Sequence, residues 1–372
     1  MKKIISGIIF TVLCSCLVPV TGLPCTTFVL DNSGQPVYGK NTDGANEWAA
    51  YVIVNKRGVA KTSAPIAQEP DAKHISWISR FGSATFNVFA REWPPDGINE
   101  AGLFIASVMG EGKGIDEYPE PDSRTPMSGL SWIQYSLDNF STVNEVIASF
   151  LRIRPAKPLD ENNSIASHWL VSDSRGNCAS IEFRGGQMVC HTGWTMPVHV
   201  LANSTYDDSI DFYRWFQIQN LISPISIPAD YRPSLLRFAV AGDRVKKYRP
   251  HRSGPAVDYA FQILEDVEID PPDNSALWSI VYNSANKRIH FRSWNNDQIR
   301  WLDFSALDFS CTTPVKVLDI SADLSGDVTD SLVDYTKEID LEMLEFWELY
   351  TGLPDAAIDY ISSYPDTTVC TE

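Results

Sequence analysis

Cys25 is the residue whose type and position best suit nucleophilic chemistry. It begins the β-branched and aromatic run Cys25–Leu30, just after a segment of the kind that secretion removes. Removal of that segment gives Cys25 a free α-amine, whose pKa of about 7.7–8.0 leaves part of it unprotonated at neutral pH. That amine can take the thiol proton and return it to a leaving amine, so no histidine is needed. The pattern favours amide cleavage through a thioester, with oxyanion donors and a cation beside the thiolate.

Residues 1–22 have the pattern of a secretory signal peptide: two lysines, the apolar stretch Ile4–Val20, and then small residues. Residues 23–24 are expected to form a short propeptide, because cleavage directly after Pro24 does not suit a signal peptidase. These features predict a periplasmic or secreted protein. Two alternatives stay open. One is a transmembrane anchor, for which the stretch is marginal because a span needs about 20 residues; the other is a lipid anchor on Cys16.

The composition narrows the classes of partner. The formal net charge is −17, and hydrophobic residues make up 44% of the chain. The acidic excess repels phosphate backbones, so nucleic acid is not expected as a partner. No second long apolar run follows the first 22 residues, so we expect no stable membrane insertion. A small-molecule substrate fits this composition, and a homo-oligomer stays open.

Five cysteines remain after the first 24 residues: Cys25, Cys178, Cys190, Cys311 and Cys370. In an oxidising compartment, two disulfides and one free thiol are the simplest arrangement of this odd number. We expect Cys178–Cys190 across a hairpin and Cys311–Cys370 tying down the tail, which leaves Cys25 free. Residue types alone leave two other interpretations of Cys25 open, a disulfide cysteine and a small buried apolar residue.

The predicted elements place Cys25 at the start of a hairpin whose strands, 25–30 and 35–40, are joined by a polar turn. Further strands are expected at 50–55, 102–108, 168–172, 179–183, 277–282 and 288–294. Apolar spacing predicts two helices within 131–153, separated at 139–142, with Ser141 as the N-cap of the second. Helices are also predicted at 209–221, 234–247 and 341–349. Strands at both ends of the chain and a helical middle, with no linker, predict one α+β domain over 25–372.

Several motifs resemble one known family. The pattern Cys25–Phe28 followed by Gly39–Asp43 resembles the start of the choloylglycine hydrolases, which are N-terminal-nucleophile hydrolases that include bile salt hydrolases and penicillin V acylases. Similar segments follow in register: Asp96–Leu103, Val200–Ser204, Pro228–Tyr231 with Arg237-Phe238, and the strand pair 278–282 and 288–294. The resemblance implies a four-layer αββα sandwich of two antiparallel sheets. It implies no metal and no cofactor.

The resemblance also implies a role for four residues. Cys25 is the nucleophile, and its own α-amine is the base. Asp43 holds that amine, Asn203 supplies an amide to the oxyanion hole, and Arg237 lies near the thiol and stabilises its thiolate form. As alternatives, Asp43 and Asn203 are turn residues and Arg237 is a surface ion-pair partner.

Two positions depart from the family pattern and bear on substrate binding and the oxyanion hole. Lys40 stands where the family usually has arginine, and lysine lacks the planar fork of a guanidinium. Met109 stands where members carry asparagine or tyrosine, so a donor there would come from the backbone only. The expected substrates are therefore linear amides in general, with penicillin V, N-acyl homoserine lactones and conjugated bile acids as candidates.

Three other functions fit the sequence less well. A papain-like hydrolase pairs its cysteine with a histidine, and the histidines here lie in no such frame. A zinc site needs spaced Cys and His clusters, of which Cys190-His191 is a poor example. The alternative from a different class is a catalytically silent, secreted ligand-binding protein on the same scaffold. The joint presence of Cys25, Asp43, Asn203 and Arg237 favours the enzyme.

Overall fold

The computed structural model describes residues 25–44, 48–66, 69, 71–110, 118–157, 167–222, 233–268, 276–351 and 353–372. The predicted signal peptide, the predicted propeptide and the motif at 228–231 lie outside these residues and stay predictions. Within the described part of the chain, no helix combines the length and the apolar character that crossing a bilayer requires.

Two large sheets form the centre of the molecule. Sheet A has the order β14-β1-β2-β15-β16-β17-β19, and sheet B has the order β13-β12-β11-β8-β7-β6-β3-β18-β20. The strands of sheet A are β14 (Val200–Ala202), β1 (Cys25–Leu30), β2 (Val37–Asp43), β15 (Ala276–Asn283), β16 (Arg288–Ser293), β17 (Asn296–Asp303) and β19 (Gly326–Asp327). The strands of sheet B are β13 (Gln187–Thr192), β12 (Cys178–Arg184), β11 (Ser167–Ser172), β8 (Phe104–Met109), β7 (Asp96–Asn99), β6 (Ser83–Asn87), β3 (Tyr51–Asn55), β18 (Lys316–Asp319) and β20 (Val333–Asp334).

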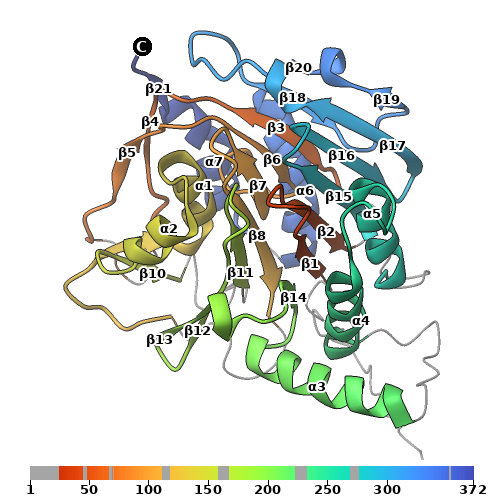
Figure 1. Ribbon diagram of the computed structural model, residues 1–372. Helices are drawn as coiled ribbons and strands as arrows, with labels where there is room; N and C mark the ends of the chain where they lie inside the picture. The colour runs from red at the N-terminus through yellow and green to blue at the C-terminus, as the bar shows by residue number, and fades with distance from the viewer. Residues whose placement is uncertain are drawn as a thin grey trace, which may run out of the picture.

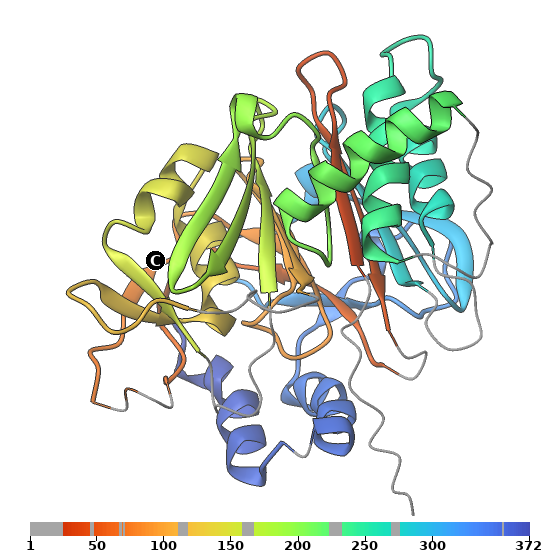
Figure 2. The ribbon, with the colours of Figure 1, turned by 90° about the horizontal axis from the view of Figure 1, so that it is seen from below.

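Helices cover the outer faces of both sheets (Figures 1 and 2). The helices are α1 (Gly129–Asn139), α2 (Val143–Ser149), α3 (Tyr206–Ile222), α4 (Ser234–Lys247), α5 (Ala256–Asp266), α6 (Lys337–Thr351) and α7 (Asp355–Ser363). In Figure 2, α1 and α2 lie outside sheet B, whereas α3, α4 and α5 lie outside sheet A. The layers therefore run helix, sheet, sheet, helix, which confirms the predicted αββα sandwich.

Smaller strands and the two C-terminal helices complete the fold. Parallel strands β9 (Thr125–Ser128) and β10 (Ile153–Ala156) form one pair, and β21 (Val369–Cys370), β4 (Val59–Thr62) and β5 (Ser76–Ile78) form a three-stranded sheet. Figure 2 shows α6 and α7 together at one end of the sheet sandwich.

The core between the two sheets explains why the strands carrying the site, β1 and β2, are buried throughout. Tyr38 of β2 stacks on Phe104 of β8 with ring centroids 4.7 Å apart, and Phe86 of β6 meets Tyr282 of β15 at 6.1 Å. On its outer side, β1 contacts α4. All six residues of β1 are buried, because this strand has packing partners on both faces.

Local sequence signals located most of these elements. The hairpin β1–β2, the break between α1 and α2, and α4 at 234–247 are confirmed. The predicted N-cap Ser141 is wrong by one residue. Thr142 caps α2 instead, because its side chain accepts from the backbone N–H of Glu145 while the Glu145 carboxylate accepts from the N–H of Thr142.

The disulfide prediction is half right. Cys311 and Cys370 are bonded, whereas Cys178 and Cys190 are free thiols, as is Cys25. The predicted hairpin around Cys178 and Cys190 does form, as β12 and β13, but its register places Cys190 opposite Ile181. Successive side chains of a strand point to opposite faces, so Cys178 and Cys190 face opposite sides of sheet B and cannot meet.

Candidate active site

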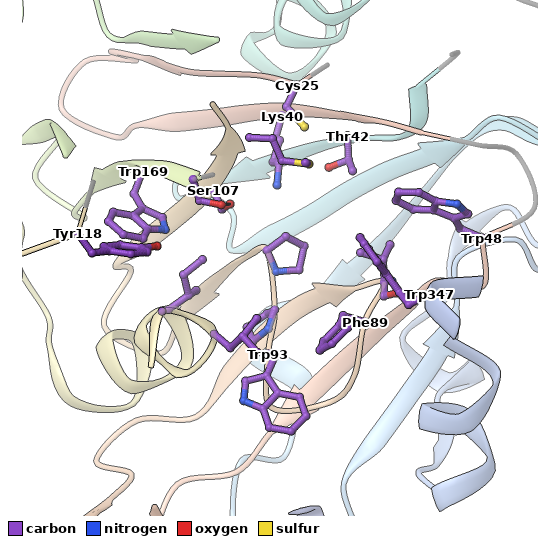
Figure 3. A pocket seen from close by; sticks show the side chains of 18 residues that line it. Cys25, Lys40, Thr42, Trp48, Phe89, Trp93, Ser107, Tyr118, Trp169 and Trp347 are labelled. Atoms are coloured by element: carbon purple, nitrogen blue, oxygen red, sulfur yellow. Dashed lines mark hydrogen bonds between the residues drawn. The ribbon is translucent and has the colours of Figure 1, made fainter. Parts of the chain in front are cut away.

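The strand pair β1–β2 places Cys25 at the wall of a pocket. In the antiparallel register Cys25 lies opposite Thr42, with Asp43 as the next residue of β2. Cys25 is only 5% exposed and lines a cavity with about 900 Å³ of empty space, part of it open to solvent. Figure 3 shows Cys25, Lys40 and Thr42 together on one wall of this cavity.

Arg237 and Asn203 hold the backbone of Cys25 in place. Arg237, from α4, donates from Nη1 to the carbonyl oxygen of Cys25 at 2.5 Å and to the hydroxyl of Thr26 at 2.7 Å. Its Nη2 donates to Oδ1 of Asn203 at 2.5 Å, and the same oxygen accepts from the backbone N–H of Cys25 at 3.1 Å. One buried guanidinium thus ties the end of β14 to the start of β1.

The amide nitrogen of Asn203 faces the other way, toward sheet B. Its Nδ2 donates to the carbonyl oxygen of Met109 at 2.7 Å. With acceptor and donor ends both engaged, the orientation of this side chain is fixed by its hydrogen bonds. Met109 lines the pocket and contributes a backbone acceptor to this contact. The predicted roles of Asn203 and Met109 toward an oxyanion stay predictions.

Asp43 is a buried carboxylate beside Cys25. Its side chain is 1% exposed, and neither carboxylate oxygen has a hydrogen-bond partner among the described residues. Burial raises the pKa of Asp43 from 3.8 to about 8, although the charges of Arg237 and Lys40 act in the opposite direction. A buried carboxylate in this setting needs a donor, and a free α-amine on Cys25 would bring one.

The charges of Lys40, Asp43 and Arg237 all act on the thiol of Cys25, and that of Asp43 raises its pKa. Burial raises the pKa of the Cys25 thiol, and the positive charge of Lys40 is the largest influence that lowers it. A backbone hydrogen bond from Asp43 and the charge of Arg237 also lower it, by smaller amounts. The sequence assigned thiolate stabilisation to Arg237, whereas the structure gives Lys40 the stronger effect.

Lys40 is itself held by Asp96, to which the sequence gave no role beyond its place in a motif. Its ammonium lies 2.6 Å from Oδ2 of Asp96, and the hydroxyl of Tyr282 donates to Oδ1 of the same carboxylate at 3.1 Å. All three side chains are buried. The signal that could have identified Asp96 is its place at the head of the segment Asp96–Leu103.

The rest of the pocket is predominantly apolar and aromatic. Six aromatic side chains in its lining, none assigned to the site from the sequence, are Trp48, Phe89, Trp93, Tyr118, Trp169 and Trp347. Apart from Phe89 and Trp93, which share one segment, they come from places far apart in the chain, so their spacing carried no signal that they share a cavity. Such a lining suits an apolar or aromatic group of a small substrate.

Comparison with known proteins agrees with this geometry. The profile of linear amide C–N hydrolases of the choloylglycine hydrolase family matches residues 25–317. This chain belongs to that family. The match begins at Cys25, the residue that the strand pair places at the pocket.

Individual relatives of the choloylglycine hydrolase family add detail. A penicillin V acylase of Pectobacterium atrosepticum is 28% identical over 325 residues, which are 77% of this chain and 83% of the relative. The structure of penicillin V acylase from Agrobacterium tumefaciens has a TM-score of 0.69 at 25% identity, covering 84% of this chain and 98% of that one. A conjugated bile acid hydrolase variant from Clostridium perfringens has a TM-score of 0.65 at 16% identity, covering 79% and 97%.

Membership of the choloylglycine hydrolase family makes this protein an enzyme. It is an amidohydrolase that acts on carbon–nitrogen bonds of linear amides other than peptide bonds. The solved relatives share the N-terminal-nucleophile hydrolase fold, which confirms the predicted fold class. Members of this family act on small amide substrates.

Proposed function

We propose that this protein is an exported amidase that uses Cys25 as an N-terminal nucleophile after removal of residues 1–24. The observation that carries the proposal is the thiol of Cys25 at the pocket wall beside the buried carboxylate of Asp43, which has no hydrogen-bond partner among the described residues. The family profile begins at the same residue. Export is supported by the signal-like prefix and by the Cys311–Cys370 disulfide, which suits an oxidising compartment.

The reaction begins with proton transfer inside residue 25. The free α-amine takes the thiol proton and becomes an ammonium, which pairs with the buried carboxylate of Asp43. Lys40 favours the resulting thiolate, as the effect of its charge on the pKa of Cys25 indicates. The sulfur then forms a bond to the carbonyl carbon of the amide, and the carbonyl oxygen becomes an oxyanion next to Asn203.

The tetrahedral intermediate collapses with loss of the amine. The carbon–nitrogen bond breaks, and the α-ammonium gives its proton to the departing nitrogen. The products of this half-reaction are a free amine and a thioester on Cys25. Water, deprotonated by the same α-amine, then adds to the thioester, releases the carboxylic acid and restores the thiol.

The proposed substrate is an amide with an apolar or aromatic acyl group. The aromatic lining of the pocket supports this choice, because apolar ligand surface is stabilised by leaving water for such walls. Penicillin V, N-acyl homoserine lactones and conjugated bile acids all have an apolar acyl part, and penicillin V is the first candidate because two of the relatives are penicillin V acylases.

Two measurements test the proposal. The first is the intact mass of the protein isolated after export, which is expected to correspond to a chain beginning at Cys25. The second is an assay of the three amide classes with wild type, Cys25→Ala and the matched control Cys190→Ser, which removes another free thiol. Cys25→Ala is expected to abolish turnover and Cys190→Ser to preserve it. A mature chain that begins elsewhere, or an active Cys25→Ala variant, would contradict the mechanism.

A further inference from the structure

One wall of the pocket comes from a part of the chain that the family profile does not match. The profile ends at residue 317, whereas α6 and α7 lie beyond it. Trp347 of α6 lines the same pocket as Cys25. Figure 3 shows the Trp347 side chain beside Phe89 and next to Trp48, on the side of the pocket away from Tyr118.

Trp347 is held in a defined orientation. Its indole Nε1 donates to the carbonyl oxygen of Val88 at 2.8 Å. Its ring centroid lies 5.3 Å from that of Trp48 with a tilt of 47°, and 5.6 Å from that of Phe89 in an edge-to-face contact. Both distances lie in the range over which aromatic rings attract each other. The three rings form an aromatic wall with Trp347 at its centre.

Helix α6 is a firm support for this wall. The carboxylate of Asp340, one turn from the start of α6, is fully buried. Its two oxygens accept from the backbone N–H of Arg91 at 2.9 Å and from the hydroxyl of Tyr335 at 2.8 Å. Met343 and Leu344, on the same helix, are also buried. Trp347 therefore projects from a helix that is anchored to the pocket segment 88–93.

The C-terminal end of the chain also contacts the pocket segment 88–93. Tyr364 lies 5.4 Å from Trp93 by ring centroids, and its hydroxyl donates to the carbonyl oxygen of Thr62. Beyond it, β21 pairs with β4, and Cys370 is bonded to Cys311. The segment that carries Trp347 is thus attached at both ends and belongs to the folded body.

From these contacts we infer that Trp347 is a specificity-determining residue, which contacts the acyl group of the substrate and favours planar aromatic acyl groups over flexible straight chains. The inference rests on the proposed function, because it takes this pocket as the acyl site. A planar ring can join the wall by edge-to-face or offset contacts, which add up to about tenfold in binding beyond the effect of buried area. A straight chain gains only from the burial of its apolar surface, and a leucine at position 347 buries that surface equally well.

The test compares two amides with the same leaving amine, one with an arylacetyl group and one with a straight-chain acyl group of similar size. The variants are Trp347→Leu, Trp347→Phe and the control Trp215→Leu, which removes a half-exposed indole from α3. Trp347→Leu is expected to lower kcat/KM for the aryl amide about tenfold relative to the straight-chain amide. Trp347→Phe is expected to retain most of the preference, and the control to leave the ratio unchanged.

Failure of this inference and failure of the proposed function give different results in this experiment. A ratio in Trp347→Leu within about threefold of wild type, with the melting temperature preserved, would overturn the inference and leave the proposed function intact. A similar loss in Trp347→Leu and Trp347→Phe for both amides would also overturn it, because that result indicates a structural role. Activity in Cys25→Ala would instead contradict the proposed function itself.

Discussion

The ammonium of Lys40 and the carboxylate of Asp96 lie 2.6 Å apart and are both buried, although they belong to different sheets. Lys40 is on β2 of sheet A, on the same pocket wall as Cys25, and Asp96 is on β7 of sheet B. Tyr282, from sheet A, donates to the same carboxylate. This ion pair therefore joins the two sheets beside Cys25, and it places the cation that most strongly favours the Cys25 thiolate.

Lys40→Met is expected to affect both stability and thiol reactivity. The variant leaves Asp96 buried without its cation, which costs about 3–5 kcal/mol in the free energy of unfolding. It also removes the largest influence that lowers the pKa of Cys25, so the midpoint for alkylation of Cys25 is expected to move to higher pH. Urea unfolding and iodoacetamide labelling, followed on the Cys25 peptide, check the two effects.

The controls for this prediction are Lys40→Arg and the double variant Lys40→Met/Asp96→Asn. Lys40→Arg keeps the charge and is expected to keep the alkylation midpoint. The double variant removes the unpaired charge, so it is expected to recover stability without restoring the midpoint. An unchanged midpoint in Lys40→Met would contradict the electrostatic role of Lys40.

Asp43→Asn is expected to lower kcat/KM by about 100-fold or more, because in the proposed mechanism the carboxylate of Asp43 holds the α-amine that acts as the general base. The variant has a distinct pH signature. Burial raises the pKa of Asp43 to about 8 from its ordinary 3.8, so the folded chain keeps a proton that the unfolded chain releases. The stability of a chain in which Asp43 lacks the α-amine therefore falls as the pH rises from about 4 to about 8. Asp43→Asn removes this pH dependence.

The pH signature is measured on a chain that begins at Leu23 and carries Cys25→Ala, with and without Asp43→Asn. Melting temperatures between pH 4 and 8 are expected to converge at low pH and to favour the asparagine variant at high pH. In the proposed mechanism the α-ammonium of a chain beginning at Cys25 pairs with Asp43, so the difference between the two variants is expected to shrink in that chain. A variant that is less stable at pH 8 than its parent would refute this account.

Arg237→Lys is expected to keep the positive charge but to lose part of the hydrogen-bond network of the guanidinium. The guanidinium donates to three oxygens, on Cys25, Thr26 and Asn203, and an ammonium on a flexible stem does not reproduce that planar fork. We expect kcat to fall more than tenfold, on the scale of losing one to two charge-assisted hydrogen bonds of about 1.5–3 kcal/mol each. A double-mutant cycle with Asn203→Ala checks the contact, and additive effects on kcat/KM would argue against a shared role.

Cys370→Ser is expected to destabilise the protein through the unfolded state. The Cys311–Cys370 bond closes a loop with a sequence separation of 59 residues, for which chain entropy predicts about 4 kcal/mol. Urea unfolding of Cys370→Ser, with Cys311→Ser as its partner variant, measures this loss. Thiol titration of the denatured, unreduced mature chain is expected to find Cys25, Cys178 and Cys190 free. Loss of both the Cys178 and the Cys190 thiol to a disulfide would show that the register of β12 and β13 differs from the one described.

Local patterns succeeded where the signal lies within a few neighbouring residues. The hairpin that carries Cys25 has β-branched strands around a polar turn, and α4 has its apolar spacing and a basic last turn. The same local reasoning misplaced the cap of α2 by one residue, because serine and threonine at adjacent positions both suit an N-cap. It also paired Cys178 with Cys190, since chain distance carries no information on which face of a sheet each side chain takes.

Some features of the site were also predicted from local motifs, and others depend on the fold. Cys25, Asp43, Asn203 and Arg237 were predicted from motifs, and the structure brings the last two onto the backbone of the first. Lys40 lowers the pKa of the Cys25 thiol more than Arg237 does, but the motifs gave thiolate stabilisation to Arg237. The importance of Lys40 depends on Asp96, a partner in the opposite sheet, and no local pattern reveals that pairing.

By itself, then, the sequence of this protein determined which side chains carry chemistry and which short segments form strands and helices, because these properties depend on residue type and on neighbours along the chain. Tertiary structure alone decided which side chains share the pocket. Trp347 reaches Trp48 and Phe89 only because α6 packs against the segment that carries Phe89 and the tail is bonded to the body. Such contacts depend on how layers pack in space, and hundreds of intervening residues hide them from any local pattern.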